Sequence, residues 1–399
     1  MHVTLASLGG GGENTMTAEC AAALKSAGCI LGARRLLERL PKGCTDNRIA
    51  AVRPRELLEA ILAQNCSCVA VYSGDAGFYS GARGLLPLLA ERGVSARVLP
   101  GVSSVQLLSA RLGVPWEDWK LVSAHGRNCD PVAAVSQGRP AFFLTGGALG
   151  PGELCKRLTE AGLGDLPVTV GVNLSAPEED IVFGTAAALA GRAFPSLSVL
   201  LAEGAPRHGP RCPGLPDSEF IRGSVPMTKR EVRAAALAKL GVRPGDVLWD
   251  VGAGTGSVSV ELALAAPEGR VFAVECEPEA CALIRENRER FSAWNLQLIK
   301  GRAPCALRDL PAPDGVFVGG SRGELEGILD AALGKNPAAR ICVSAIAVET
   351  LSAAVAALTA RGLEAGVTQI AVSRTKTAGA LHLLMANNPV FLITGNCHG

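Results

Sequence analysis

The sequence predicts an α/β protein built from two consecutive domains. Short β-branched runs alternate with helical patterns along its 399 residues, which is typical of sheets covered by helices. Residues 203–218 break this alternation with four prolines and three glycines. At roughly 100–200 residues per domain, the length fits two or three domains. We therefore expect one domain at 1–202, a linker at 203–218 and a second domain at 219–399.

The first domain is expected to alternate strands with helices, which implies parallel strands. The predicted strands are 3–8, 67–72, 96–99, 120–123, 141–145, 168–172 and 196–201, and the predicted helices are 17–27, 54–64, 81–92, 104–111 and 152–161.

The second domain shows the same alternation more clearly, and it predicts a Rossmann-like, seven-stranded, mostly parallel sheet. The predicted strands are 247–251, 271–275, 296–300, 315–318, 341–345, 368–372 and 381–386, and the predicted helices are 229–240, 258–265, 278–291, 324–333 and 350–361.

The overall composition excludes several classes of protein. The 39 Lys and Arg against 37 Asp and Glu give a net charge of +2, which argues against bulk capture of nucleic acid. The 48% hydrophobic content with 19% charged residues excludes intrinsic disorder. The 13 scattered cysteines indicate reduced thiols without a metal site. Because neither a signal peptide nor a membrane span is recognisable, we expect a cytoplasmic protein.

A glycine-rich loop carries the strongest chemical signal. Residues 247–256 read VLWDVGAGTG, so a buried strand runs into the pattern Gly252-x-Gly254-x-Gly256 and a helix follows. Glycines at such a turn let a ligand approach the backbone and the free N–H groups of the helix start. A dinucleotide loop needs its third glycine at the position of Ser257, and the preceding Asp250 would repel a pyrophosphate. A ligand with an ammonium group and no phosphate, such as S-adenosylmethionine, suits this loop better.

The next two strand ends extend the same site. Glu275 ends the following strand and can accept hydrogen bonds from two ribose hydroxyls, while the backbone at Gly301 can hold an adenine edge. Three successive strand ends thus predict a site for S-adenosylmethionine; the alternative is a structural turn with a chance acid. The expected cofactor contacts are Thr228, Asp250, Gly252, Ala253, Gly254, Thr255, Gly256, Glu275, Gly301, Arg302 and Ala303.

Motifs around this loop resemble a known family. Residues 226–233 (PMTKREVR), 316–321 (VFVGGS) and 388–395 (NPVFLITG) are similar to the decarboxylating precorrin methyltransferases of cobalamin biosynthesis. The resemblance spans about 217–395 and implies methylation of C15 together with removal of carbon dioxide from the C12 acetate. Glu275 stands where many relatives carry Asp, and Ala253 stands where they often carry Cys.

The first domain resembles the tetrapyrrole methylases, a second fold that uses S-adenosylmethionine and has two lobes. Gly74-Asp75-Ala76 is similar to the family's G-D-P, and residues 100–104 (PGVSS) match its P-G-[IV]-S-S. The loop at 8–13 (LGGGGE) lacks the proline of the family's G-x-G-P-G. The resemblance implies methylation of C5 of the same precorrin, with cofactor contacts at Gly74, Asp75, Ala76, Ser103, Ser104 and Thr145.

Two of these first-domain residues have plain structural alternatives. Asp75 can simply cap a turn. His125, which follows a predicted strand, can be a satisfied strand-end histidine.

The chemistry expected from both resemblances needs little covalent help. An electron-rich ring carbon attacks a sulfonium methyl, so the enzyme has to align the reactants and exclude water. Decarboxylation additionally requires a proton donor near the ring. The candidates are Lys229, Arg233, Arg374 and His382, with the arginines gripping substrate carboxylates. Alternatively, Lys229, Arg230 and Arg233 form a solvated helix face.

A slot for a flat ring is expected at Gly320 and Ser321, which follow the fourth strand. The expected partner is therefore a precorrin-type tetrapyrrole, and the protein is expected to self-associate. The acid-rich ligand also requires basic clefts within a nearly neutral chain. The competing hypotheses are a methyltransferase acting on RNA or a small metabolite, a nucleotide-dependent dehydrogenase and a non-catalytic binding module.

Overall fold

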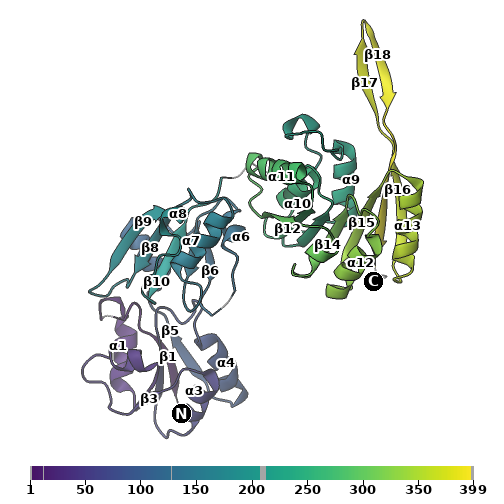
Figure 1. Ribbon diagram of the computed structural model, residues 1–399. Coiled ribbons are helices and arrows are strands. Elements are labelled where there is room, and N and C mark those ends of the chain that lie inside the picture. The colour runs from purple at the N-terminus through teal and green to yellow at the C-terminus, as the bar shows by residue number, and fades with distance from the viewer. Residues whose placement is uncertain (1, 12, 127, 207–212, 397–399) are drawn as a thin grey trace. The chain divides into compact units, whose positions relative to one another are not determined.

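The computed structural model describes the chain except for residues 1, 12, 127, 207–212 and 397–399 (Figure 1). It forms two compact units, one of Met1–Cys129 and Arg139–Glu203, the other of Asp130–Gly138 and Gly204–Gly399. Residues 207–212 of the predicted linker lie outside the described residues.

The first lobe of the N-terminal unit is a five-stranded parallel sheet in the order β3-β2-β4-β1-β5. Two apolar layers cover its faces, one under α3 and α4 and the other under α1 and α2. The strands are β1 (Val3–Ser7), β2 (Cys29–Gly32), β3 (Arg48–Ala50), β4 (Cys68–Tyr72) and β5 (Ala96–Leu99), and the helices are α1 (Ala18–Ser26), α2 (Arg34–Leu37), α3 (Pro54–Leu62) and α4 (Ala82–Glu91). The sequence prediction missed β2 and β3, which are too short for a clear pattern.

The second lobe has a mixed sheet in the order β6-β7-β10-β8-β9, in which β10 runs antiparallel to both neighbours. The expectation of parallel strands is therefore wrong for this lobe. Its strands are β6 (Lys120–Ser123), β7 (Ala141–Leu144), β8 (Pro167–Val172), β9 (Asp180–Thr185) and β10 (Ser198–Ala202), with α5 (Ser104–Leu112), α7 (Pro151–Glu160) and α8 (Ala186–Leu189). The short helix α6 (Pro131–Val135) belongs to the other unit.

The C-terminal unit contains a seven-stranded sheet in the order β13-β12-β11-β14-β15-β19-β16, with only β19 antiparallel to its neighbours. The predicted seven-stranded, mostly parallel sheet is confirmed. Its strands are β11 (Val247–Val251), β12 (Arg270–Glu275), β13 (Leu296–Lys300), β14 (Gly315–Val318), β15 (Arg340–Ala345), β16 (Glu364–Ile370) and β19 (Val390–Asn396).

Helices cover both faces of this sheet (Figure 1). The side chains of β11 alternate: Leu248 packs in the layer under α9, α10 and α11, and Trp249 packs in the layer under α12 and α13. The helices are α9 (Arg230–Leu240), α10 (Ser257–Ala265), α11 (Pro278–Arg290), α12 (Leu325–Lys335) and α13 (Val348–Thr359), with short 3₁₀ turns η2 (Asp217–Glu219) and η3 (Cys305–Leu307).

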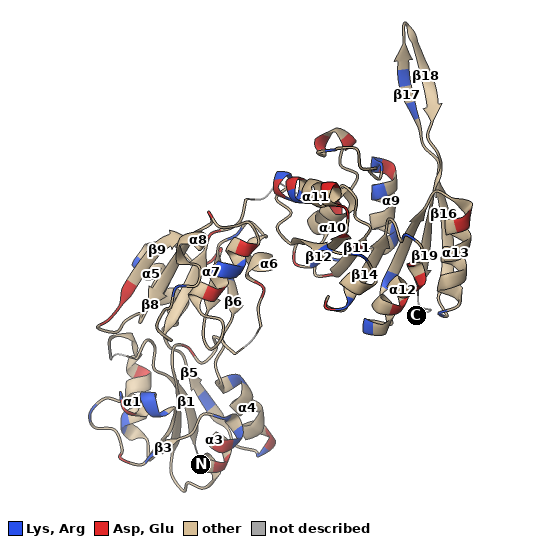
Figure 2. Ribbon diagram, viewed as in Figure 1, with Lys and Arg blue, Asp and Glu red and all other residues tan. Residues whose placement is uncertain are grey.

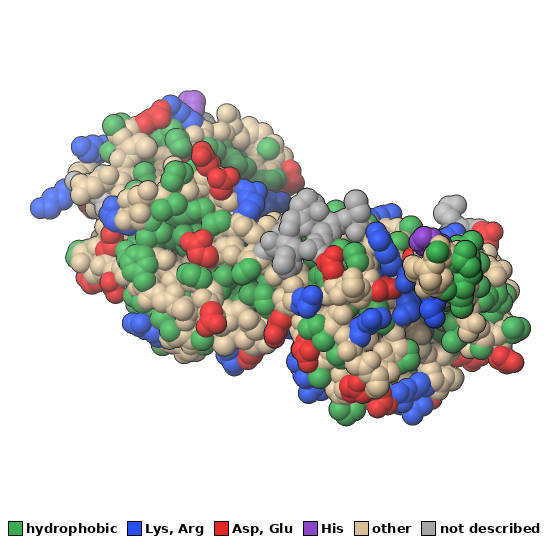
Figure 3. Space-filling view, turned by 90° about the horizontal axis from the view of Figure 1, so that it is seen from above, with side chains coloured by type: hydrophobic (Ala, Val, Ile, Leu, Met, Phe, Trp, Pro, Cys, Tyr) green, Lys and Arg blue, Asp and Glu red, His purple; other side chains and the backbone are tan. Residues whose placement is uncertain are grey.

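One predicted member of the sheet is wrong. Residues 381–386 form β18 (Leu381–Ala386), which pairs with β17 (Ser373–Ala378) in a separate hairpin. Leu384 is 73% exposed there, whereas Leu392 of β19 is fully buried between β15 and β16. Both runs are apolar in sequence, and only packing distinguishes them. The exposed hairpin residues form a hydrophobic cluster on the unit's surface (Figure 3).

Charges of both signs are scattered over the ribbons of both units (Figure 2), in keeping with the small net charge of +2. Within the described part of the chain, no helix combines the length and apolar character needed to cross a membrane.

Candidate functional site

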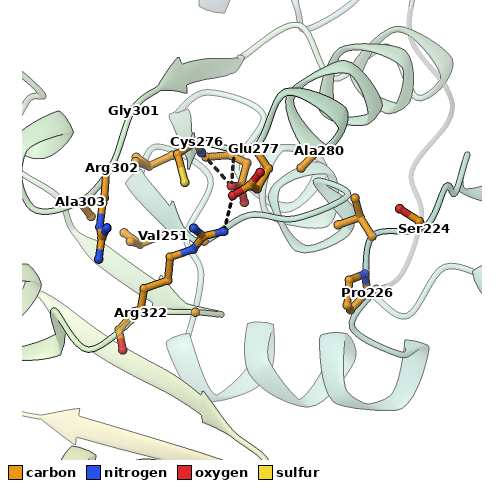
Figure 4. A pocket seen from close by; sticks show the side chains of 16 residues that line it. Ser224, Pro226, Val251, Cys276, Glu277, Ala280, Gly301, Arg302, Ala303 and Arg322 are labelled. Carbon is orange, nitrogen blue, oxygen red and sulfur yellow. Dashed lines mark hydrogen bonds and ion pairs between the residues drawn. The ribbon is translucent and has the colours of Figure 1, made fainter.

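The C-terminal unit has a cleft of about 370 Å³ at the carboxyl ends of β11, β12, β13 and β14 (Figure 4). This edge is where open α/β sheets bind ligands. The segment before α9 forms an additional wall. The lining residues are Ser224, Val225, Pro226, Val251, Gly252, Val274, Glu275, Cys276, Glu277, Ala280, Gly301, Arg302, Ala303, Gly320, Ser321 and Arg322.

Gly252 shapes the floor of this cleft. Its φ of +71° is in the left-handed region, and a Cβ there would lie 2.4 Å from the carbonyl oxygen of Gly320. Its amide donates to the carbonyl of Val274 at 3.0 Å, so the loop folds back over the end of β12. Only glycine satisfies both the backbone angle and the close approach.

Glu275 lies at the end of β12 and is buried, with 8% of its surface exposed. One carboxylate oxygen accepts the amide of Gly254 at 2.9 Å, and the other accepts the amides of Cys276 at 2.7 Å and Glu277 at 3.0 Å. These bonds fix the carboxylate on the cleft wall. Because a carboxylate offers about four acceptor sites, it can still receive a ribose hydroxyl. The fixed acid and the narrow glycine floor fit an adenosyl cofactor.

Asp250 does not reach the cleft, which corrects the expected contact with an ammonium group. It shares the face of β11 that carries Leu248, and it is 1% exposed. Ser259 of α10 donates to one carboxylate oxygen, and the other has no partner. Burial, with a smaller contribution from the charge of Glu275, raises the pKa of Asp250 to about 7. Asp250 therefore joins β11 to α10 and does not contact the ligand side of the loop.

An ion pair joins two loops of this cleft. The guanidinium of Arg322, which follows β14, donates to the carboxylate of Glu277, which follows β12, at 2.6 Å. Figure 4 shows the two side chains reaching toward each other. Arg322 has a φ of +49°, a strained angle for a residue with a side chain. The pair spans the end of β11, because β11 lies between β12 and β14 in the sheet.

Arg233 is a buried structural residue, which corrects its expected role in gripping carboxylates. Its guanidinium is 0% exposed and donates to Glu261 at 2.7 Å and to Asp217 at 2.8 Å. It also donates to the carbonyls of Leu215 and Thr228. These bonds fasten the segment before α9 to α10, and part of that segment, around Pro226, forms the cleft wall.

The other predicted substrate contacts also lie away from the cleft. Arg374, at the base of the hairpin, pairs with Asp217 at 3.2 Å and with Glu231 at 2.6 Å. Lys229 is the exposed N-cap residue of α9, and His382 is exposed on β18 opposite Thr377. Thr228 offers its carbonyl to Arg233 and does not line the cleft.

Seven predicted residues of this domain do come together in the cleft: Gly252, Glu275, Gly301, Arg302, Ala303, Gly320 and Ser321. Ala253, Gly254, Thr255 and Gly256 shape the loop without lining it. Sequence reasoning missed Ser224, Val225, Cys276, Glu277, Ala280 and Arg322. Two of them, Cys276 and Arg322, directly follow the predicted positions Glu275 and Ser321, which is the signal that could have found them.

The N-terminal unit has a cleft of about 240 Å³ between its two lobes. Loops after β1, β4 and β5 form one side, and residues of β7, β8 and β10 form the other. Reciprocal bonds between Gly9 and Gly74, 3.1 and 2.7 Å long, tie the first two loops together. The predicted residues Gly74, Asp75, Ser103, Ser104 and Thr145 all line it, whereas Ala76 is buried behind it.

Asp75 behaves as the structural alternative describes. One carboxylate oxygen accepts the amide of Gly77 at 2.7 Å and the other accepts the amide of Gly101 at 2.9 Å. A Cβ at Gly101 would lie 2.6 Å from the carbonyl oxygen of Gly74, so these loops pack backbone to backbone. Asp75 thus joins the loops after β4 and β5.

Other predicted residues of this cleft are also held by backbone partners. Ser103 caps α5 with Gln106, and the hydroxyl of Thr145 donates to the carbonyl of Ser198 at 2.6 Å. A ring nitrogen of His125 lies 3.3 Å from the carbonyl of Thr145, as the strand-end alternative describes. Sequence reasoning missed two cations at this cleft, Arg35 and Arg39.

Models of two known families match different parts of the chain. A model of the precorrin methyltransferase domain matches residues 220–395, and a model of the tetrapyrrole (corrin/porphyrin) methylases matches residues 2–190.

Individual relatives match either most of the chain or about half of it. The precorrin-6Y C(5,15)-methyltransferase [decarboxylating] of Sinorhizobium sp is 34% identical over 83% of this chain and 81% of its own length. The probable cobalt-precorrin-6B C(15)-methyltransferase (decarboxylating) of Pyrobaculum calidifontis is 48% identical over 46% of this chain and 95% of its own length. A crystal structure of a precorrin-6Y C5,15-methyltransferase from Geobacter metallireducens, 38% identical with a TM-score of 0.45, covers 47% of this chain and 100% of that chain.

Proposed function

The chain belongs to the family of decarboxylating precorrin-6Y C5,15-methyltransferases, and on that premise we propose that its two clefts carry out the two methylations separately. The C-terminal cleft methylates C15 and serves the decarboxylation of the C12 acetate, and the N-terminal cleft methylates C5. Family membership makes the protein an S-adenosylmethionine-dependent methyltransferase of cobalamin biosynthesis and removes the dehydrogenase and binding-module alternatives.

The observation that carries the proposal is the arrangement around Glu275. Glu275 is positioned to accept a ribose hydroxyl, the loop at Gly252 lets the ligand approach the backbone, and Gly301 with Ala303 offers backbone to the adenine. When bound, the cofactor supplies an electrophilic methyl group. The protein contributes position and the exclusion of water, which suffice because the substrate ring is itself the nucleophile.

Gly320 leaves room for the flat substrate beside this site. A Cβ at Gly320 would meet no atom within 4 Å, so the space next to its backbone is open. Three side chains that follow β13 and β14 line the cleft and can donate hydrogen bonds: Arg302, Ser321 and Arg322. In our proposal these donors replace Lys229, Arg233, Arg374 and His382 as the groups that assist protonation of the ring and hold the carboxylates.

In the N-terminal cleft, the proposal assigns the cofactor to the loops after β1, β4 and β5. Asp75 and the Gly9–Gly74 contact keep these loops rigid, so Ser103 and Ser104 stand fixed around the ligand. Thr145, which follows β7, is held by its own bond to Ser198. We place the enzyme in the cytoplasm because the described cysteines Cys20, Cys29, Cys68 and Cys155 are free buried thiols. Self-association and the lack of a nucleic-acid partner stay predictions.

Product analysis tests the proposal. The full chain, incubated with S-adenosylmethionine and either metal-free or cobalt precorrin, is expected to give a product heavier by two methyl groups and lighter by carbon dioxide in the mass spectrum. The preferred substrate then distinguishes the metal-free from the cobalt route.

A substitution separates the two clefts. Gly320→Val is expected to abolish C15 methylation and decarboxylation, because its side chain fills the open slot, while C5 methylation continues. Equal loss of both methylations would contradict the assignment of separate sites.

A further inference from the structure

Two arginines on the rim of the N-terminal cleft have no function in the account above. Arg35 lies on α2 and Arg39 follows its C-terminus, and both line the cleft. They are four residues apart, so they share one face of the turn. A Cβ at Gly11 would lie 3.8 Å from a guanidinium nitrogen of Arg39, which places this charge beside the glycine loop after β1.

The charge of these arginines is uncompensated in the described structure. Both side chains are exposed, and neither forms an ion pair with another described residue. The single carboxylate among the lining residues belongs to Asp75, and the amides of Gly77 and Gly101 occupy its two oxygens. The cleft-lining Arg322 of the other unit, by contrast, is paired with Glu277.

The interior of the same cleft is apolar. Phe78, Leu107, Leu144 and Leu174 line it, and Leu107 is 8% exposed. An apolar slot with two adjacent guanidiniums at its rim suits a flat ring whose edge bears several carboxylates. S-adenosylmethionine fits the pair less well, since it has one carboxylate next to its own ammonium group.

We propose that Arg35 and Arg39 form a carboxylate-binding subsite that positions the tetrapyrrole for methylation at C5. The inference rests on the proposed function of the N-terminal cleft. Both arginines are positioning residues: they bind substrate side chains at the rim and leave the methyl transfer itself to the ring and the cofactor. The subsite also supplies one of the basic clefts that an acid-rich ligand requires.

Position-resolved kinetics on the full chain test this subsite. With ¹³C-methyl S-adenosylmethionine and precorrin-6Y, NMR distinguishes the methyl groups added at C5 and C15. Arg35→Ala and Arg39→Ala are each expected to raise the KM for C5 methylation roughly three- to tenfold, with little change in kcat, because each removes a charge-assisted contact. The KM for C15 methylation stays unchanged and serves as the internal control.

Three further measurements make the result specific. Arg34→Ala, on the same helix but outside the cleft lining, is the matched control and is expected to behave as the wild type. Arg39→Lys should recover part of the loss. Raising the salt concentration should reduce the difference between Arg39→Ala and the wild type.

Binding experiments distinguish failure of the inference from failure of the proposed function. Both variants are expected to bind uroporphyrin, a porphyrin with eight carboxylates, more weakly than Arg34→Ala does, and to bind S-adenosylhomocysteine normally. Weaker uroporphyrin binding in a chain that never methylates C5 would support the subsite and overturn the proposed reaction. Unchanged uroporphyrin affinity, or weakened S-adenosylhomocysteine affinity, would overturn the subsite.

Discussion

The two clefts use acidic side chains in opposite ways. In the N-terminal cleft, Asp75 is occupied by two backbone amides, and the cations Arg35 and Arg39 remain available. In the C-terminal cleft, Glu275 and Glu277 line the wall, and Glu277 forms an ion pair with the guanidinium of Arg322. The first arrangement favours an anionic ligand at its rim, and the second favours a ligand rich in hydroxyl groups. Two clefts assigned to one cofactor have thus been built from different local chemistry.

The clefts also differ in what holds their walls. The N-terminal loops are tied by backbone hydrogen bonds such as those between Gly9 and Gly74. The wall of the C-terminal cleft around Pro226 depends on the buried pairs of Arg233 with Glu261 and Asp217. Removing one partner of a buried ion pair is strongly destabilising, because the other charge stays buried. We therefore expect single substitutions to disturb the wall of the C-terminal cleft more than that of the N-terminal cleft.

The largest effect is expected from Arg233→Ala. Removing the guanidinium leaves the buried Glu261 with the amides of Gly214 and Leu215 but without a counter-charge, which should destabilise the C-terminal unit by about 3–5 kcal/mol. Calorimetric unfolding of the full chain is expected to show a lower transition for this unit and an unchanged one for the N-terminal unit. Arg374→Ala is the matched control: its exposed pairs should contribute only about 0–1 kcal/mol. An equal loss of stability in Arg233→Ala and Arg374→Ala would show that the burial of Arg233 does not make its ion pairs more important for stability than those of Arg374.

A pH-dependent effect is expected at Asp250. Its folded-state pKa of about 7 lies above the ordinary value of 3.8, so the folded state binds this proton more tightly. The resulting stability is present below about pH 4 and is lost as the pH rises through 7.

Asp250→Asn should therefore raise the free energy of unfolding at pH 8 by roughly 2 kcal/mol relative to the wild type, and so unfold at a higher temperature. The difference should shrink at pH 5, and thermal denaturation followed by circular dichroism measures both. If the stability difference between Asp250→Asn and the wild type is the same at both pH values, the Asp250 carboxyl does not take up a proton in this range.

The smallest effect is expected at the ion pair between Arg322 and Glu277. Because it spans the loops beside the cofactor cleft, Arg322→Ala should release S-adenosylhomocysteine from the C-terminal cleft roughly two- to fivefold faster, in line with exposed ion pairs of up to about 1 kcal/mol. Stopped-flow dissociation measures this rate. The N-terminal cleft provides the control, and Arg34→Ala should change neither rate. An unchanged dissociation rate would show that the ion pair of Arg322 does not help to retain the cofactor, and would leave Arg322 only a role in binding the substrate.

Much of the site could be predicted because glycine patterns and strand ends are local features. Gly252, Glu275 and Gly301 follow successive strands, and parallel strands bring their carboxyl ends to one edge. The side chains on helix and strand surfaces were harder to predict. Nothing in the sequence around Arg233 or Arg374 reveals the distant acids that occupy them, Glu261 and Asp217.

The sequence by itself determined the α/β class, the cofactor loop at Gly252 and the family, because these depend on local pattern and on motifs. Tertiary structure alone decided which charged groups are free. Arg233 became a buried anchor, Asp250 turned away from the cleft, and Arg35 and Arg39 remained open on a rim. It also placed β19 in the sheet and left β18 in an exposed hairpin. The physical reason is that charge pairing and burial depend on residues far apart in the chain, whose meeting is set by packing.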